Sequence, residues 1–203
     1  MSSRLFLVAL AAMTVSGLSA ARAQDYPLDR AFVSRVVIAE TNAWRAAKGL
    51  PPVSNHPQLE AAATAYARYL AQTEGVGHTA DGKSPAIRVR ATGYNYCFVA
   101  ENMWGGWRRP NPMTEAEASK KAMDDWKKSP GHNANLLGKG KNIGVGVAAW
   151  RLGDRVVFRM VQVFGTADCA AGPKAKPFVT KVTQKAPPKK APVAQSRQKP
   201  NQQ

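Results

Sequence analysis

Only the middle of the chain, residues 24–171, has the composition of a folded domain, because both ends are built differently. Residues 1–23 read as an export signal. Arg4 supplies the positive start, residues 5–12 form a short apolar stretch, and residues 21–23 (Ala-Arg-Ala) fit the small-x-small pattern that precedes cleavage. The apolar stretch is well short of the roughly 20 residues that a membrane-spanning helix needs, and no later stretch supplies one. We therefore expect an exported chain, periplasmic or extracellular, without a transmembrane segment.

The last part of the chain, residues 172–203, has a composition that opposes folding. It holds six of the fourteen prolines, a single aromatic residue (Phe178), eight lysines and arginines, and no acidic residue. Such a segment buries too little apolar surface to offset the entropy of ordering it, so we expect a disordered tail. The tail is either a polycationic arm that contacts an anionic envelope polymer or a linker with no partner.

Net charge is the most unusual bulk property, and most of it lies outside the expected domain. The whole chain carries +16, but two positive charges belong to residues 1–23 and eight to residues 172–203. Residues 24–171 hold nineteen basic and thirteen acidic residues, a net charge of +6. Because the domain is only moderately basic, we do not expect nucleic acid to be its partner.

Helical patterns come first in the middle segment and strand patterns come last. Apolar residues at helical spacing, bounded by caps and glycine stops, mark residues 28–48, 57–74, 85–91 and 114–128. Residues 142–164 read as a β-hairpin with its turn at residues 152–154, and a third strand is expected near residues 96–104. Helices and strands that are grouped rather than alternated predict an α+β fold with an antiparallel sheet.

Three side chains could carry chemistry: His78, Glu101 and His132. Imidazole titrates near neutral pH and binds metals as the neutral base. Two histidines and one carboxylate could hold Zn²⁺ with one position left for water or substrate. The three residues are 23 and 31 positions apart, so only the fold can bring them together. A histidine beside glycine is, by itself, more commonly a loop residue.

A series of motifs, in order along the chain, resembles one known family. The motifs are Gly77-His78-Thr79, Gly93-Tyr94, Ala100-Glu101-Asn102, residues 126–137 (WKKSPGHNANLL) and residues 143–148 (IGVGVA). With the first helix and residues 161–164 (VQVF), they resemble the bacterial branch of the CAP superfamily. That superfamily groups cysteine-rich secretory proteins, antigen 5 venom proteins and the class 1 pathogenesis-related proteins of plants. The resemblance covers roughly residues 30–166.

The resemblance implies a three-layer α-β-α sandwich, with a central antiparallel sheet between helical layers and an open cleft. In that cleft the family commonly gathers two histidines and two acidic residues. By motif, His78 and His132 take the histidine positions and Glu101 takes one acidic position. Ser129 stands where many eukaryotic relatives have the second, a glutamate three residues after a tryptophan, here Trp126. One carboxylate weakens the case for tight zinc binding and for a mechanism that needs a carboxylate pair.

Polar residues beside these motifs have two interpretations each. The amides of Asn102 and Asn135 could orient a histidine through its second ring nitrogen, or they could cap the backbone. Ser129 could be a nucleophile next to His132, but Ser-Pro-Gly-His reads more simply as a turn that enters a short helix. We include all three polar residues in the expected cleft.

The glycine- and proline-rich stretch 103–113 contains Trp104, Trp107, Arg108 and Arg109. Aromatic rings interleaved with arginine could form a rim of the cleft that stacks on a sugar or a planar ligand. The simpler interpretation is a surface loop that one buried tryptophan anchors.

Cys97 and Cys169 are the only cysteines, and pairing is the expected state of two cysteines in an exported protein. The bridge would join the strand that leads to Glu101 to the end of the sheet. A loop of this length would stabilise the fold by roughly 4 kcal/mol. The alternative is a nucleophilic Cys97 near His78, which predicts a free thiol.

Two functions from different classes follow from these residues. The first is a binding module whose cleft recognises a lipid, a glycan or another envelope component. The second is a metal-assisted, peptidase-like hydrolase in which His78, His132 and Glu101 bind the metal, or Glu101 acts as general base. The missing second carboxylate and the lack of an evident nucleophile favour the binding module. We expect a monomer, while the ligand and the question of catalysis stay open.

Overall fold

The computed structural model describes residues 24–108 and 113–167. The expected export signal, the basic tail, Arg109 and Cys169 lie outside the described residues. Within them, no helix combines the length and the apolar character that crossing a membrane requires.

The described residues form five helices and five strands. In chain order these are β1 (Gln24–Asp25), α1 (Arg30–Ala46), β2 (Ser54–Asn55), α2 (Pro57–Thr73), α3 (Pro85–Ala91), β3 (Tyr96–Arg108), α4 (Glu115–Lys128), α5 (Pro130–Leu136), β4 (Asn142–Leu152) and β5 (Arg155–Ala167). The four predicted helices and three predicted strands are confirmed, and α5 is the short helix expected after Ser129. The two-residue strands β1 and β2 were not predicted, because a pair of residues carries no periodicity.

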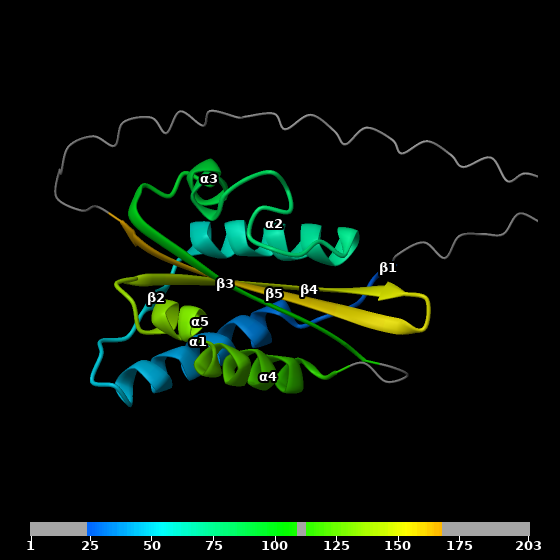
Figure 1. The fold of residues 1–203 in the computed structure, drawn as a ribbon, viewed down its shortest axis with the longest axis horizontal. Helices are drawn as coiled ribbons and strands as arrows, with labels where there is room; N and C mark the ends of the chain where they lie inside the picture. Colours follow the sequence, from blue (N-terminus) through cyan, green and yellow to red (C-terminus); the bar gives the residue numbers. More distant parts are fainter. Residues whose placement is uncertain (1–23, 109–112, 168–203) are drawn as a thin grey trace, which may run out of the picture. The chain divides into compact units, whose positions relative to one another are not determined.

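The sheet lies between two helical layers, with α2 and α3 over one face and α1, α4 and α5 over the other (Figure 1). The strand order is β1-β4-β5-β3, so β3 is an edge strand, and β2 pairs with β4. The α+β sandwich and the β4–β5 hairpin are therefore confirmed.

Two details of the sheet differ from the prediction. The long strands β3, β4 and β5 pair antiparallel as predicted, and the short β2, which was not predicted, runs parallel to β4, so the sheet is mixed. Strand β3 continues beyond Trp104 to Arg108, where it pairs with Val156, so residues 105–108 are strand rather than loop. The glycines at 105 and 106 hid this continuation, because glycine normally weakens a strand pattern.

Side-chain caps define where the helices begin. The Asp29 carboxylate accepts a hydrogen bond from the Phe32 backbone N–H (2.8 Å), which caps α1. Thr114 and Glu117 form the reciprocal capping box expected from the sequence and start α4. Helix α2 starts with Pro57 in its first turn, where a missing N–H costs nothing.

Alternating glycines in β4 allow α2 to pack directly on the sheet. A Cβ atom at Gly144 would lie 2.1 Å from the backbone nitrogen of Glu60, and one at Gly146 would lie 2.2 Å from that of Thr64. Only glycine fits at such a close approach of two backbones. The Gly-x-Gly pattern therefore sets how close α2 comes to the sheet.

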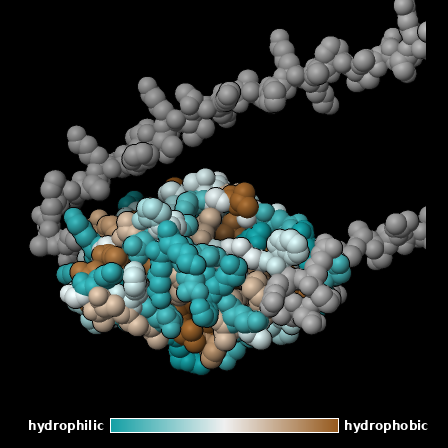
Figure 2. All heavy atoms as spheres, turned by 60° about the horizontal axis from the view of Figure 1, so that its bottom comes forward, coloured by the Kyte–Doolittle hydropathy of each residue, from teal (hydrophilic) through white to brown (hydrophobic). Residues whose placement is uncertain are grey.

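Each face of the sheet carries its own apolar core. On the α2 side the core includes Leu59, Tyr66 and Val161, and on the opposite side it includes Trp126, Phe158 and Phe164. The outward surface of the α1 and α4 layer is mainly hydrophilic (Figure 2). The two cores hold β3 firmly at the sheet edge, which is where the expected site residues lie.

Candidate functional site

The expected site residues come from the edge strand β3 and from two elements beside it. Glu101 lies within β3, His78 lies in the loop between α2 and α3, and His132 lies in α5 on the opposite layer. His78 Nδ1 is 2.8 Å from the Glu101 Oε1, and the His78 side chain is 47% exposed, whereas the Glu101 side chain is only 1% exposed. The structure thus brings His78 and Glu101 into contact, with the imidazole on the outside.

Arg88, which the sequence analysis missed, neutralises Glu101. One guanidinium nitrogen donates to both carboxylate oxygens of Glu101, at 2.8 and 3.0 Å, and the other donates to Asp81 at 2.9 Å. The guanidinium carbon also lies 3.4 Å from the centre of the Tyr66 ring, a cation–π contact. Arg88 is buried, so this cluster is a desolvated ion-pair network rather than a surface contact.

Arg88 and Tyr66 also hold the loop that carries His78 in place through hydrogen bonds. Arg88 donates a hydrogen bond to the His78 backbone carbonyl at 3.0 Å. The Tyr66 hydroxyl donates to the Gly77 carbonyl and accepts from the Ala80 backbone N–H at 3.1 Å. Burial raises the pKa of Tyr66, so its hydroxyl stays protonated and can donate. These bonds fix the backbone of the loop on both sides of His78, and Glu101 holds the ring.

His132 is a neutral imidazole at neutral pH. Burial, and secondarily the charge of nearby His78, lower the pKa of His132 below its ordinary value. Of the expected grouping, His78 and Glu101 are in direct contact. His132 is joined to β3 through its backbone carbonyl, which accepts a hydrogen bond from Asn102, the residue after Glu101.

A buried row of amides connects the site to the rest of the fold. Asn135 donates to the Asn102 side-chain oxygen at 2.8 Å, Asn102 donates to Gln162 at 3.0 Å, and Gln162 donates to Thr41 at 2.9 Å. The row runs through α5, β3, β5 and α1, so it fixes α5 relative to the sheet.

The two asparagines act on backbone rather than on imidazole rings. Asn102 donates to the backbone carbonyl of His132 at 3.1 Å, and Asn135 donates to that of Glu101 at 3.2 Å. Neither amide bonds a histidine ring nitrogen among the described contacts. Of the two interpretations, backbone capping is therefore the one that agrees with the structure.

The other predicted cleft residues have less direct roles. Ser129 ends α4 and precedes α5, and its hydroxyl makes no hydrogen bond within the described part of the chain, which agrees with a turn. Trp104 is buried and donates to Asp125 at 2.9 Å on the α4 side, so it is not a rim residue. Trp107 is 57% exposed. Arg108 is the last residue of β3.

The donor set does not fit a three-ligand zinc site. Both carboxylate oxygens of Glu101 already accept hydrogen bonds from Arg88, and a metal ion there would lie against the guanidinium. Residues 24–108 and 113–167 contain no group of three or more His, Cys, Asp or Glu side chains placed to hold a metal ion.

The fold and the site define a class: an α-β-α sandwich with a histidine–glutamate cluster at the edge of its sheet. A sequence model described as the cysteine-rich secretory protein family, CAP, matches residues 38–164. This range is more than half of the chain, and the chain belongs to that family. A comparison with curated protein sequences finds no match.

Solved structures with the same fold come from bacteria. An outer surface protein from Borrelia burgdorferi aligns with a TM-score of 0.59 and 18% identity, over 71% of this chain and 98% of that one. An extracellular protein containing an SCP domain from Bacillus anthracis aligns with a TM-score of 0.55 and 18% identity, over 67% of this chain and 41% of that one. At these identities the similarity shows the fold.

Proposed function

We propose that the protein is an exported ligand-binding module whose ligand contacts the exposed imidazole of His78 and the half-buried imidazole of His132. The observation that carries the proposal is the arrangement of Glu101, which is buried and held by Arg88 and by His78 Nδ1. Because Nδ1 is engaged, Nε2 of His78 is the ring nitrogen left for a ligand. A lipid headgroup, a glycan or another envelope component offers the hydroxyl and carbonyl groups that such a fixed imidazole recognises.

The same arrangement gives the metal-assisted hydrolase less support. A general base must be able to take up a proton and must reach the reacting group. The Glu101 side chain is nearly inaccessible, and its charge is balanced by a guanidinium. Glu101 is therefore better suited to holding His78 than to reacting with a substrate.

The proposal is tested by identifying what the protein retains. Full-length protein is incubated with an envelope extract, washed and denatured, and the released small molecules are identified by mass spectrometry. We expect a retained compound that His132→Ala loses and that His56→Asn keeps, since His56 packs on Tyr94 outside the cleft. Hydrolysis of a peptide and ester panel that disappears in His132→Ala would instead support the enzyme.

We extend the proposal to the two ends of the chain: residues 1–23 as a cleaved export signal, residues 24–171 as the domain, and residues 172–203 as an arm that contacts an anionic surface. The composition of these segments supports this division. N-terminal sequencing of the exported protein should begin near Gln24. A truncation before Gly172 should be released from an envelope pull-down at lower salt than the full chain, and equal release would remove the arm from the account.

A Cys97–Cys169 disulfide is part of the proposal. Tyr96 pairs with Ala167 at the end of the sheet, so the chain leaves β5 beside Cys97 and two residues before Cys169. Thiol titration of the denatured, unreduced protein should detect no free thiol. Two free thiols would contradict the disulfide and would support the alternative of a reactive Cys97.

A further inference from the structure

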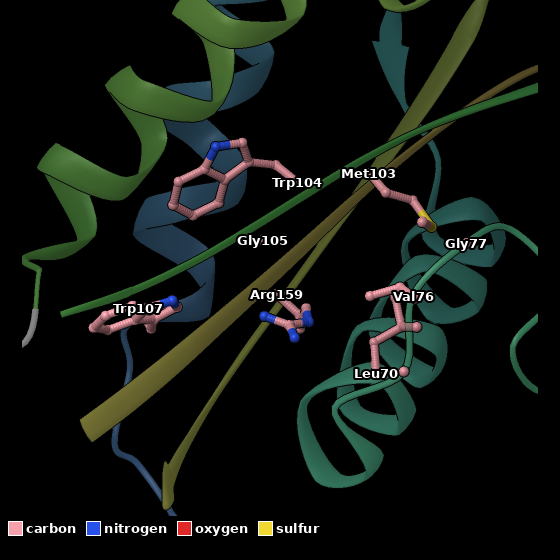
Figure 3. A pocket seen from close by; sticks show the side chains of 9 residues that line it. Leu70, Val76, Gly77, Met103, Trp104, Gly105, Trp107 and Arg159 are labelled. Carbon is pink, nitrogen blue, oxygen red and sulfur yellow. The ribbon is translucent and has the colours of Figure 1, made fainter. Parts of the chain in front are cut away.

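A pocket of about 320 Å³ lies along the same face of β3 and reaches Gly77, the residue before His78 (Figure 3). We call it the Arg159 pocket, and its main lining side chains are Leu70, Val76, Met103, Trp107 and Arg159. Side chains alternate between the faces of a strand, so Glu101, Met103, Gly105 and Trp107 follow one another along one face of β3. The pocket lining includes Gly77, so the pocket borders the loop that carries His78.

The walls of the Arg159 pocket are apolar and open to solvent. Leu70 and Val76 come from the end of α2 and the loop after it, and they face Trp107 across the pocket (Figure 3). Val76 is 81% exposed and Trp107 is 57% exposed, and both belong to the small set of large hydrophobic side chains that the described surface exposes. Exposed apolar side chains that surround a concave site are typical of a ligand pocket.

Arg159 is the cationic side chain that lines the pocket, and no acidic side chain of the described residues pairs with it. Arg159 lies opposite Gly105 in the β3–β5 register, and a Cβ atom at residue 105 would lie 3.0 Å from a guanidinium nitrogen. Glycine therefore leaves room for the guanidinium over β3. The guanidinium donates to the Phe158 carbonyl at 3.0 Å, and no carboxylate of the described residues lies within ion-pair distance. Glu74, whose charge acts on Arg159, pairs with Arg155 instead, at 2.6 Å.

The environment of Arg159 adds a second reason to expect an anion. Burial lowers the pKa of its guanidinium, while Glu74 raises it and Arg155 lowers it. An arginine nevertheless stays protonated at neutral pH. A half-buried positive charge without a counter-ion is costly, and a bound anion would remove that cost.

We propose that the Arg159 pocket binds an amphipathic organic anion, with its carboxylate on the Arg159 guanidinium and its flat or apolar body between Trp107 and the side chains of Met103 and Val76. The guanidinium offers paired donors that match a carboxylate. Trp107 is 57% exposed and lines the pocket, so its indole adds apolar contact area for the body of the ligand. This inference rests on the proposed binding function and specifies the charge and shape of its ligand.

A matched pair of probes tests the inference. Calorimetric titration of the full-length protein compares 2-naphthoate with its uncharged analogue 2-naphthamide. We expect naphthoate to bind about tenfold to a hundredfold more tightly, because a hydrogen-bonded charge pair is formed only with the acid. Arg159→Gln should abolish this preference. Arg151→Gln, an equal change in net charge on the exposed end of β4, should keep it.

A third variant separates the two halves of the pocket. Trp107→Ala should weaken both probes by a similar factor and leave the preference for the acid, because it removes the wall and not the charge. Circular dichroism establishes that each variant is folded. Equal affinity of the two probes, absence of binding, a preference that survives Arg159→Gln, or a preference that Arg151→Gln also removes would each overturn the inference. The retention experiment with His132→Ala tests the binding function separately.

Discussion

Two arginines lie on the same side of the sheet, and their surroundings differ in every respect. Arg88 is buried, bonds to Glu101 and Asp81, and stacks on the Tyr66 ring. Arg159 is half-buried in an apolar pocket, and within the described residues its guanidinium bonds only to the Phe158 backbone. The fold supplies counter-ions for Arg88, whereas no described carboxylate pairs with Arg159. We therefore propose that a ligand pairs with Arg159.

This contrast separates the part of the cleft that maintains structure from the part that we propose for the ligand. A charge with several internal partners contributes to stability, and its loss leaves those partners unpaired. A charge without partners contributes little to stability but can contribute to binding. Stability and ligand affinity should therefore respond to different substitutions.

Removal of Arg88 should have the largest effect. Arg88→Met leaves the buried carboxylate of Glu101 without its counter-ion, so we expect the free energy of unfolding to fall by about 3–5 kcal/mol in chemical denaturation. Arg90→Met, on the exposed side of the same helix, should change it by less than about 1 kcal/mol. The double variant Arg88→Met with Glu101→Gln should recover part of the loss, and no recovery would contradict the charge argument.

A smaller change should disturb Arg159 through its neighbour. Gly105→Ala places a methyl group 3.0 Å from the guanidinium, which must then move. We expect the affinity for 2-naphthoate to fall about fivefold, since a displaced side chain costs on the order of 1 kcal/mol. The affinity for 2-naphthamide is the internal control and should stay the same. Equal loss for both probes would mean that the methyl group blocks the pocket rather than moving the charge.

Low pH should destabilise the folded protein through protonation of His132. Its pKa is lower in the folded protein than in the unfolded chain, so the unfolded state binds more protons as pH falls below about 6.5. The stability contribution is therefore intact above that pH and is lost as pH falls through the folded pKa. We expect His132→Asn to show a flatter stability profile below about pH 6.5. Parallel profiles for wild type and variant would contradict the assigned shift.

Loss of Arg159 should have the smallest effect on stability. Arg159→Gln breaks no ion pair within the described residues and removes a half-buried charge that has no counter-ion there, so we expect the free energy of unfolding to stay level or to rise by less than about 1 kcal/mol. The same variant should lose the preference for the acid probe. If Arg159→Gln destabilised the protein as much as Arg88→Met, Arg159 would also be a structural arginine, and the contrast would be wrong.

Much of the fold could be predicted from the sequence, because its signals are local. The capping box at Thr114 and Glu117 and the alternation around Gly144 and Gly146 predicted elements that the structure confirms. The end of β3 could not be predicted, because consecutive glycines interrupt the strand pattern there. The contact between His78 and Glu101 came from motif resemblance, since no spacing rule joins residues 23 positions apart.

The two arginines could not be assigned from sequence for a common reason. Arg88 follows Ile87 and precedes Val89 in a short helix, where burial of one charged residue has no periodic signal. Arg159 interrupts an otherwise apolar strand pattern, and this single charge among Val157, Phe158 and Met160 was the available signal. Whether such a charge finds a partner depends on which elements pack beside it, and only the fold supplies that information.

The most direct test of this account is a titration of full-length protein with 2-naphthoate, followed by NMR of the arginine side-chain Nε–Hε resonances. We expect the Arg159 resonance to shift and saturate while the Arg88 resonance stays in place. An unmoved Arg159 resonance, or an Arg88 resonance that shifts as much, would contradict the division between a structural and a ligand-binding arginine.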